Sequence, residues 1–201
     1  METSGEYFRS DVPAGQSGAW VVEKVSIPAR DYDPTSDPRP DCFKFRPGLY
    51  TCLRRDQTQF MTDLYDEWWT QREGIAEALA RGGDVLVTGL GLGLVAEAML
   101  RPAASPVRRV TVVEFSQDVI RLVKPHLDSR YPGRVEVFEA DAFKWEPPQG
   151  RRFTVCWHDI WPDPQAPGNA EEMQRLEERY RQWCDWQGFW PKSYVEALAG
   201  R

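Results

Sequence analysis

The chain has 201 residues, of which 41% are hydrophobic and 12% aromatic, so it can bury one sizeable core. Its formal net charge of −6 argues against a nucleic-acid partner, because a phosphate backbone attracts clustered cations. No segment approaches the about 20 apolar residues that a membrane span needs, and the start lacks the apolar segment of a signal peptide. We therefore expect a cytoplasmic protein without a membrane partner.

Four cysteines are scattered through the chain without a CxxC pair. Their spacing indicates neither a zinc site nor a disulfide framework, so we expect reduced, mostly buried thiols and no bound metal. They are Cys42, Cys52, Cys156 and Cys184.

Turn-forming residues dominate the beginning of the chain, above all in Asp31–Asp41 (DYDPTSDPRPD), which predicts a loop or extended arm. Three β-prone segments, Ala19–Ile27, Gly48–Arg54 and Gln59–Met61, predict strands, the last two joined as a hairpin. We assign residues 1–62 to this N-terminal arm and hairpin.

Residues 63–165 alternate between helical and strand patterns. Helical spacing begins at Asp63 and stops at the Gly82-Gly83 pair. Repeated β-α-β units require parallel strands, so we expect an α/β fold with a Rossmann-like, doubly wound, mostly parallel sheet. The predicted strands are 85–88, 110–113, 135–138 and 153–157, and the predicted helices between them are 92–100 and 117–127.

The last part, residues 166–201, predicts one amphipathic helix over Asn169–Trp186 and a Trp-rich tail. No strand is predicted after it, so the fourth strand of the sheet is left as an open edge. The helix is expected to cover the sheet. The alternative is a homodimer, through this helix or through the open edge.

A glycine-rich turn follows the first strand of the parallel sheet. Gly89, Gly91 and Gly93 alternate, and the next position is Leu94, so the spacing is GxGxG and not the dinucleotide fingerprint GxGxxG. Such a turn brings bare backbone close to a ligand, although glycines there can also be purely conformational.

Acidic residues stand at the next two strand ends. Glu114 can accept hydrogen bonds from both hydroxyls of a ribose, and Asp141 can accept one from an adenine amino group. Each has a structural alternative as a solvated or helix-capping residue. Ligands of parallel sheets bind at this edge, so the three strand ends together favour a nucleoside site.

The segments VLVTGLGLG, VTVVEFSQDVI, VEVFEADAF and FTVCWHDI together resemble the class I adenosylmethionine-dependent methyltransferases. They are most similar to the spermidine synthase branch. Val87, the Glu114-Phe115 step and the upstream stretch LYTCLRRDQTQFMTDLYDE favour that branch. The resemblance covers residues 48–165 and implies a fold shortened at its C-terminal end.

The resemblance implies adenosylmethionine, or decarboxylated adenosylmethionine, as the cofactor. It places the turn beside the amino-acid part of the cofactor, Glu114 on the ribose, Phe115 against the adenine face, and Asp141 with Ala142 at the adenine edge. Spermidine synthases carry an aspartate where this chain has Leu92. The turn residues implied are Gly89, Leu90, Gly91 and Gly93.

The end of the fourth strand, VCWHDIWPDP, holds the candidate catalytic residues His158 and Asp159. A histidine exchanges protons near neutral pH, and an aspartate can orient an amine or accept its proton. Trp157 and Trp161 could bind a cationic substrate through their rings, or simply pack in the core. Further substrate contacts are expected from Gln59, Asp63 and Glu67, which are alternatively a surface helix start.

Three functions remain open at this point. The first is a methyltransferase that acts on a small or amine-bearing acceptor. The second is an aminopropyltransferase that uses decarboxylated adenosylmethionine, against which Leu92 counts. The third is a catalytically inactive module that binds a nucleoside or a protein partner.

Overall fold

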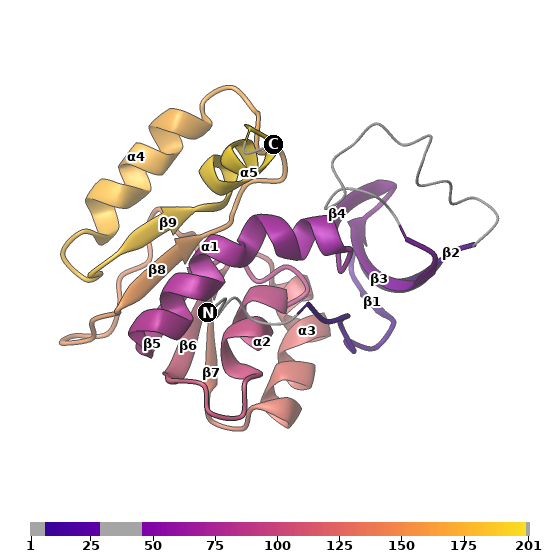
Figure 1. Ribbon diagram of the computed structural model, residues 1–201, viewed down its shortest axis with the longest axis horizontal. Helices are drawn as coiled ribbons and strands as arrows, with labels where there is room; N and C mark the ends of the chain where they lie inside the picture. Colours follow the sequence, from indigo (N-terminus) through magenta and orange to yellow (C-terminus); the bar gives the residue numbers. More distant parts are fainter. Residues whose placement is uncertain (1–6, 29–45, 200–201) are drawn as a thin grey trace.

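The computed structural model describes residues 7–28 and 46–199, and within them the chain forms two sheets (Figure 1). The predicted loop Asp31–Asp41 and Cys42 lie outside the described residues. The smaller sheet is antiparallel in the order β1-β2-β3-β4. Its strands are β1 (Gly15–Ser17), β2 (Trp20–Ile27), β3 (Gly48–Arg55) and β4 (Thr58–Thr62). The predicted hairpin is confirmed.

The main sheet is parallel throughout, in the order β7-β6-β5-β8-β9, which confirms the α/β, Rossmann-like prediction. Its strands are β5 (Gly83–Thr88), β6 (Val107–Glu114), β7 (Val135–Glu139), β8 (Val155–His158) and β9 (Gln187–Phe189). The helices are α1 (Tyr65–Arg81), α2 (Leu94–Leu100), α3 (Gln117–Arg130), α4 (Asn169–Tyr180) and α5 (Trp190–Ala199). Figure 1 shows α1 leading from the end of β4 in the small sheet across the main sheet.

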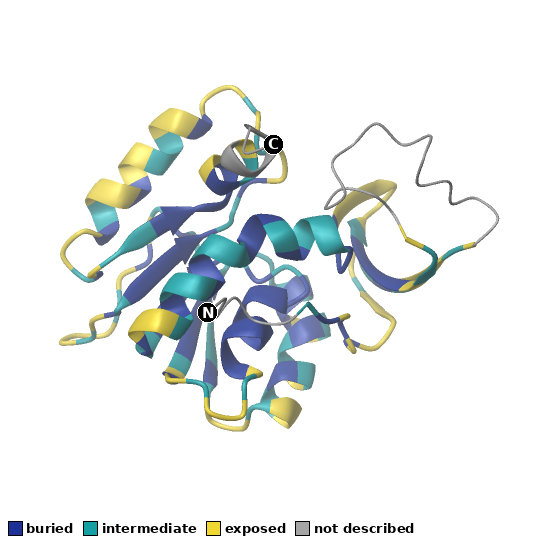
Figure 2. Cartoon of the chain, in the orientation of Figure 1, coloured by how far each residue is buried: buried dark blue, intermediate teal, exposed yellow. Residues whose placement is uncertain are grey.

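The central strands of the main sheet are buried on both faces (Figure 2). Val85, Leu86 and Val87 of β5 are at most 2% exposed, and all of β8 is buried. Runs of apolar residues without alternation are typical of parallel strands covered by helices on both sides. The core therefore lies around β5 and β8, the two strands between which the order of the sheet reverses.

The prediction for the C-terminal part is wrong in two respects. The amphipathic helix ends at Tyr180 instead of Trp186, and β9 and α5 follow it. Because β9 pairs with β8, the edge of the fourth predicted strand is covered by the chain itself. A strand of three residues is too short to show periodicity, which is why the sequence pattern missed it.

The helix α4 covers the sheet, as the simpler interpretation predicted. Leu176 and Tyr180 are fully buried, and the Tyr180 hydroxyl donates a hydrogen bond to the carbonyl of Ala142 at 2.8 Å. Figure 2 shows the opposite face of α4 exposed. A homodimer stays a prediction.

The expectation of reduced thiols is wrong for one pair, because Cys156 and Cys184 form a disulfide with their Cα atoms 6.0 Å apart. Cys156 lies on β8, and Cys184 lies in the segment that leads into β9. Pairing of β8 with β9 brings them together across 28 residues of sequence, so their spacing carried no signal. Cys52 is a buried free thiol.

Two features are absent from the described residues. No helix there is long and apolar enough to cross a membrane. No group of three or more His, Cys, Asp or Glu side chains there could hold a metal ion.

Candidate functional site

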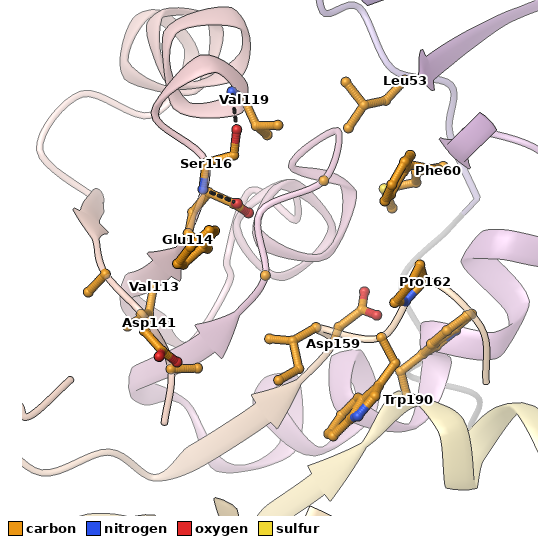
Figure 3. Close-up of a pocket in the computed structure, with 18 of the residues that line it drawn as sticks. Leu53, Phe60, Val113, Glu114, Ser116, Val119, Asp141, Asp159, Pro162 and Trp190 are labelled. Atoms are coloured by element: carbon orange, nitrogen blue, oxygen red, sulfur yellow. Dashed lines mark hydrogen bonds between the residues drawn. The ribbon is translucent and has the colours of Figure 1, made fainter. Parts of the chain in front are cut away.

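A cavity of about 430 Å³ opens at the carboxyl ends of β5, β6 and β8 (Figure 3). It is lined at these strand ends by Gly89, Glu114 and Asp159, and on other sides by Phe60 of β4 and Trp190 of α5. The strand order reverses between β5 and β8, which is where open parallel sheets bind ligands.

The glycine turn owes its composition to close packing. Gly89 has φ +93°, and a Cβ there would collide with the carbonyl oxygen of Asp159. Gly91 has φ +49°, and its Cβ would collide with the sulfur of Met61. Gly93, at φ +76°, is the N-cap of α2. Gly89 and Gly91 line the cavity, so their bare backbone is available to a ligand.

Glu114 is fixed at the end of β6 by two backbone amides. Its Oε2 accepts a hydrogen bond from the N–H of Leu90 at 2.8 Å. Its Oε1 accepts one from the N–H of Ser116 at 2.7 Å, which Figure 3 shows. Burial raises the pKa of Glu114, while these amide hydrogen bonds lower it. Each oxygen keeps a further lone pair, so the carboxylate can still accept two hydroxyl groups.

The residues predicted to contact the adenine base lie at the same end of the cavity as Glu114. Phe115 is 78% exposed, and Asp141 and Ala142 complete this wall. The Oδ1 of Asp141 accepts a hydrogen bond from the N–H of Phe143 at 2.9 Å, which fixes the carboxylate. An exposed aromatic ring on a cavity wall can stack on a base.

Two carboxyl groups lie at the opposite end. Asp159 and Glu67 both line the cavity, and the Oδ2 of Asp159 accepts a hydrogen bond from Nε2 of Gln71 at 2.7 Å. Burial, with a contribution from the charge of Glu114, raises the pKa of Asp159 to about 7. Burial and the charge of Asp159 raise the pKa of Glu67 well above its ordinary value. Asp159 can therefore accept or release a proton near neutral pH.

Two tryptophans form the wall beside this carboxyl pair. The indole N–H of Trp161 donates to Glu172 at 2.8 Å, and that of Trp190 donates to the hydroxyl of Thr70 at 3.0 Å. Since both N–H groups have partners in the protein, the rings serve the cavity as apolar surface. Trp161 was predicted, whereas Trp190 was missed because α5 itself was not predicted.

His158, predicted as catalytic, does not reach the cavity. It is 0% exposed, with Nδ1 3.0 Å from the hydroxyl of Thr88 and Nε2 3.1 Å from Oε1 of Gln187. Burial lowers the pKa of His158 to about 4, so the ring is neutral at cellular pH. Its neighbour Asp159 lies beyond the end of the strand and reaches the ligand side instead.

Three residues predicted to bind substrate also lie outside the cavity lining. Trp157 is fully buried beneath it, and Gln59 is exposed on β4. Asp63 is 1% exposed and accepts hydrogen bonds from the N–H groups of Ser10 and Thr51, each at 2.8 Å. Asp63 therefore fastens the N-terminal segment to β3.

No family model and no curated protein matches the sequence. Among solved structures, a spermidine synthase in complex with the transition-state analogue AdoDATO matches 94% of this chain and 64% of its own, with 17% identity and a TM-score of 0.52. The chain has the fold of spermidine synthase.

Two methyltransferase structures match this chain over a shorter span. A putative RNA methyltransferase from Pyrococcus horikoshii has 15% identity and a TM-score of 0.45, and the match covers 59% of this chain and 55% of that one. A dimethyladenosine transferase from Plasmodium falciparum has 22% identity and a TM-score of 0.40, and the match covers 53% of this chain and 35% of that one. The chain thus spans about a third to two thirds of these three proteins.

In this example of the spermidine synthase fold, position 92 contributes no charge to the cavity. Leu92 is fully buried, and its N–H donates a hydrogen bond to the sulfur of Met61 at 3.1 Å. The described residues that line the cavity include no Lys, Arg or His. Its acids are Glu67, Glu114, Asp141 and Asp159. Because acids are the only ionisable side chains among the described residues of the lining, the cavity favours a cationic ligand.

Proposed function

We propose that the chain is a transferase that binds adenosylmethionine, or its decarboxylated form, and passes a carbon group from its sulfonium to a small amine-bearing acceptor. The observation that carries the proposal is the Glu114 carboxylate, held by two amides beside a turn whose residues Gly89 and Gly91 line the cavity. Phe115 and Asp141 extend the same wall toward a base.

When bound, the cofactor supplies a sulfonium carbon that is already activated, so no covalent enzyme intermediate is needed. Glu114 and the glycine turn would hold the nucleoside, while Trp161 and Trp190 exclude water from the far end. The cofactor would supply this carbon to the amine nitrogen, and the electron pair of the broken carbon–sulfur bond would pass to sulfur. Asp159 accepts the proton that the amine loses, a role suited to a carboxyl group with a pKa of about 7.

The acceptor class is proposed from the charge of the cavity. The cavity lining holds acids and, among the described residues, no Lys, Arg or His, which favours a small amine over a nucleic acid.

The same observation favours aminopropyl transfer as a second candidate. Adenosylmethionine carries a carboxylate that needs a cation or amides, whereas its decarboxylated form carries an ammonium group in place of a zwitterion. Glu67 and Asp159 lie at the end of the cavity that this ammonium group would reach.

Calorimetry with both cofactors, followed by mass spectrometry of products from a panel of primary amines, tests these proposals. Tighter binding of the decarboxylated form, with an aminopropyl product, supports the second candidate. Tighter binding of adenosylmethionine with a methylated product supports methyl transfer. Binding without any product indicates an inactive nucleoside-binding module, and the absence of binding to either cofactor overturns the proposal.

A further inference from the structure

The side chain of Trp157 lies between two glycines. A Cβ at Gly74 of α1 would collide with its ring, and a Cβ at Gly188 of β9 would come within 2.7 Å of it. These two positions let an indole enter between α1 and β9, where it is 0% exposed and stacks on Trp186 with ring centroids 6.4 Å apart. Its Nε1 is thereby placed against Gln71, one helical turn before Gly74.

This contact fixes the orientation of the Gln71 amide. The indole N–H can only donate, and it lies 2.6 Å from Oε1 of Gln71, so the amide oxygen must face Trp157. The amide nitrogen then faces Asp159, to whose Oδ2 it donates at 2.7 Å. A hydrogen bond from Gln71 also reaches Glu67, four residues earlier on the same helix. A flipped amide would put two donors together at Trp157 and an oxygen against Asp159.

We propose that Gln71, oriented by Trp157, is the positioning residue that stabilises the ionised form of Asp159 and reserves its Oδ1 for the ligand. The role in transfer rests on the proposed function, whereas the effect on the carboxyl group does not. Gln71 is 1% exposed, so it acts through Asp159 and Glu67 and does not line the cavity.

The charged and titratable groups around Asp159 and Glu67 determine the direction in which loss of Gln71 shifts their pKa values. Burial and the charges of neighbouring acids raise the pKa of both carboxyl groups: Glu114 acts on Asp159, while Asp159 and Asp66 act on Glu67. From α5, Tyr194 faces the same acids, because Asp66 and Glu67 raise its pKa in addition to burial. The hydrogen bond from Gln71 lowers the pKa of Asp159 and of Glu67. Its loss must therefore shift both titrations to higher pH.

The test compares Gln71→Met, which keeps the approximate shape but cannot donate, with the wild-type chain. Carboxyl 13C NMR on the ligand-free protein, assigned with Asp159→Asn, follows the titration directly. We expect the midpoint of Asp159 to rise by about one pH unit or more, as for the loss of a hydrogen bond to a charged group. Binding of a cationic adenosyl sulfonium at pH 7 should weaken about fivefold, because less Asp159 is ionised.

Trp157→Phe removes the indole N–H while keeping an aromatic ring, and should shift the midpoint in the same direction by less. Trp186→Phe disturbs the same ring stack without touching Gln71, and should leave the midpoint unchanged. Thermal unfolding followed by circular dichroism checks that each variant is folded. If Gln71→Met does not fold, Trp157→Phe serves as the test variant.

An unchanged Asp159 midpoint in Gln71→Met, or equal shifts in Trp157→Phe and Trp186→Phe, would overturn the proposal. Failure of the Gln71 proposal can be distinguished from failure of the proposed function, because the carboxyl titration needs no ligand. A wild-type chain that binds no adenosyl compound refutes the proposed function, and the carboxyl midpoints still decide the role of Gln71.

Discussion

The two ends of the cavity are built differently. At the nucleoside end, Glu114 is held by the amides of Leu90 and Ser116, that is, by the glycine turn and its own strand end. At the acceptor end, Asp159 is held by the side chain of Gln71, which lies 88 residues earlier in the chain and is in turn fixed by Trp157. Backbone contacts dominate one end and side-chain contacts between distant elements the other.

This difference implies that the two ends respond differently to substitution. Backbone amides present the same groups whatever the neighbouring side chains are, so the nucleoside end depends on few residues. The acceptor end depends on the packing of α1 against β8 and α5.

Gly89→Ala should have the largest effect, because the new methyl group would collide with the carbonyl of Asp159 at a residue with φ +93°. We expect a loss of about 3 kcal/mol in unfolding free energy and no measurable binding of adenosyl compounds. Gly133→Ala is the matched control, since φ is +72° there and nothing lies within 4 Å of the added Cβ. It should cost about 1 kcal/mol by urea denaturation. Equal losses of unfolding free energy in the two variants would refute the close approach of Gly89 to the carbonyl of Asp159.

Asp159→Asn should slow transfer by about 100-fold or more while leaving the affinity for 5′-methylthioadenosine unchanged, since it removes the proton acceptor and not the nucleoside contacts. The measurement is single-turnover transfer beside equilibrium binding. A parallel loss of nucleoside affinity would show that the two ends are not separable.

The same variant should change how stability depends on pH. The pKa of Asp159 is raised from 3.8 to about 7, so the folded state binds more protons between these values and the unfolding free energy of the wild type falls as pH rises through this window. Asp159→Asn removes that contribution, whereas burial still raises the pKa of Glu67. Denaturation midpoints from pH 4 to pH 8 check this, and an unchanged slope would contradict the raised pKa.

Glu114→Ala should weaken nucleoside binding by about tenfold to 100-fold, because a charge-assisted hydrogen bond is lost and two amides lose their partner. The sharper readout is selectivity. The wild type should prefer 5′-methylthioadenosine to its 2′-deoxy analogue, and the variant should bind the two alike. Retained discrimination in the variant would mean that Glu114 does not contact the ribose.

His158→Gln should have the smallest effect on function, since His158 lies outside the cavity lining. We expect unchanged nucleoside affinity and transfer, with a loss of about 1 kcal/mol in stability from poorer hydrogen bonds to Thr88 and Gln187. A loss of transfer comparable to that of Asp159→Asn would restore His158 as a catalytic residue.

Most of the fold could be predicted because its signals are local. The glycine turn, the apolar strands and the helix starts each depend on neighbouring residues, and the parallel sheet follows from their alternation. The strand β9 could not be predicted, since three residues show no period and its place beside β8 is fixed by Gly188 packing on Trp157 and Trp186. The disulfide was missed for the same reason, because it joins β8 to the segment before β9.

The candidate site divides in the same way. Most residues predicted to bind the cofactor line the cavity, whereas Leu90 and Gly93 do not; those that do are Gly89, Gly91, Glu114, Phe115, Asp141 and Ala142. At the acceptor end, the type of residue was a poor guide to its position. His158 has suitable chemistry but is buried between β5 and β9, while Gln71 and Trp190 gave no local signal and depend on contacts across the fold.

The most direct test of the central claim is a calorimetric titration of the wild-type chain with 5′-methylthioadenosine, which carries the nucleoside and a sulfur but no cation. Saturable binding at one site per chain, lost in Gly89→Ala and weakened in Glu114→Ala, is the predicted result. No binding to the wild type, or equal binding to all three proteins, would contradict the assignment of this cavity to an adenosyl nucleoside.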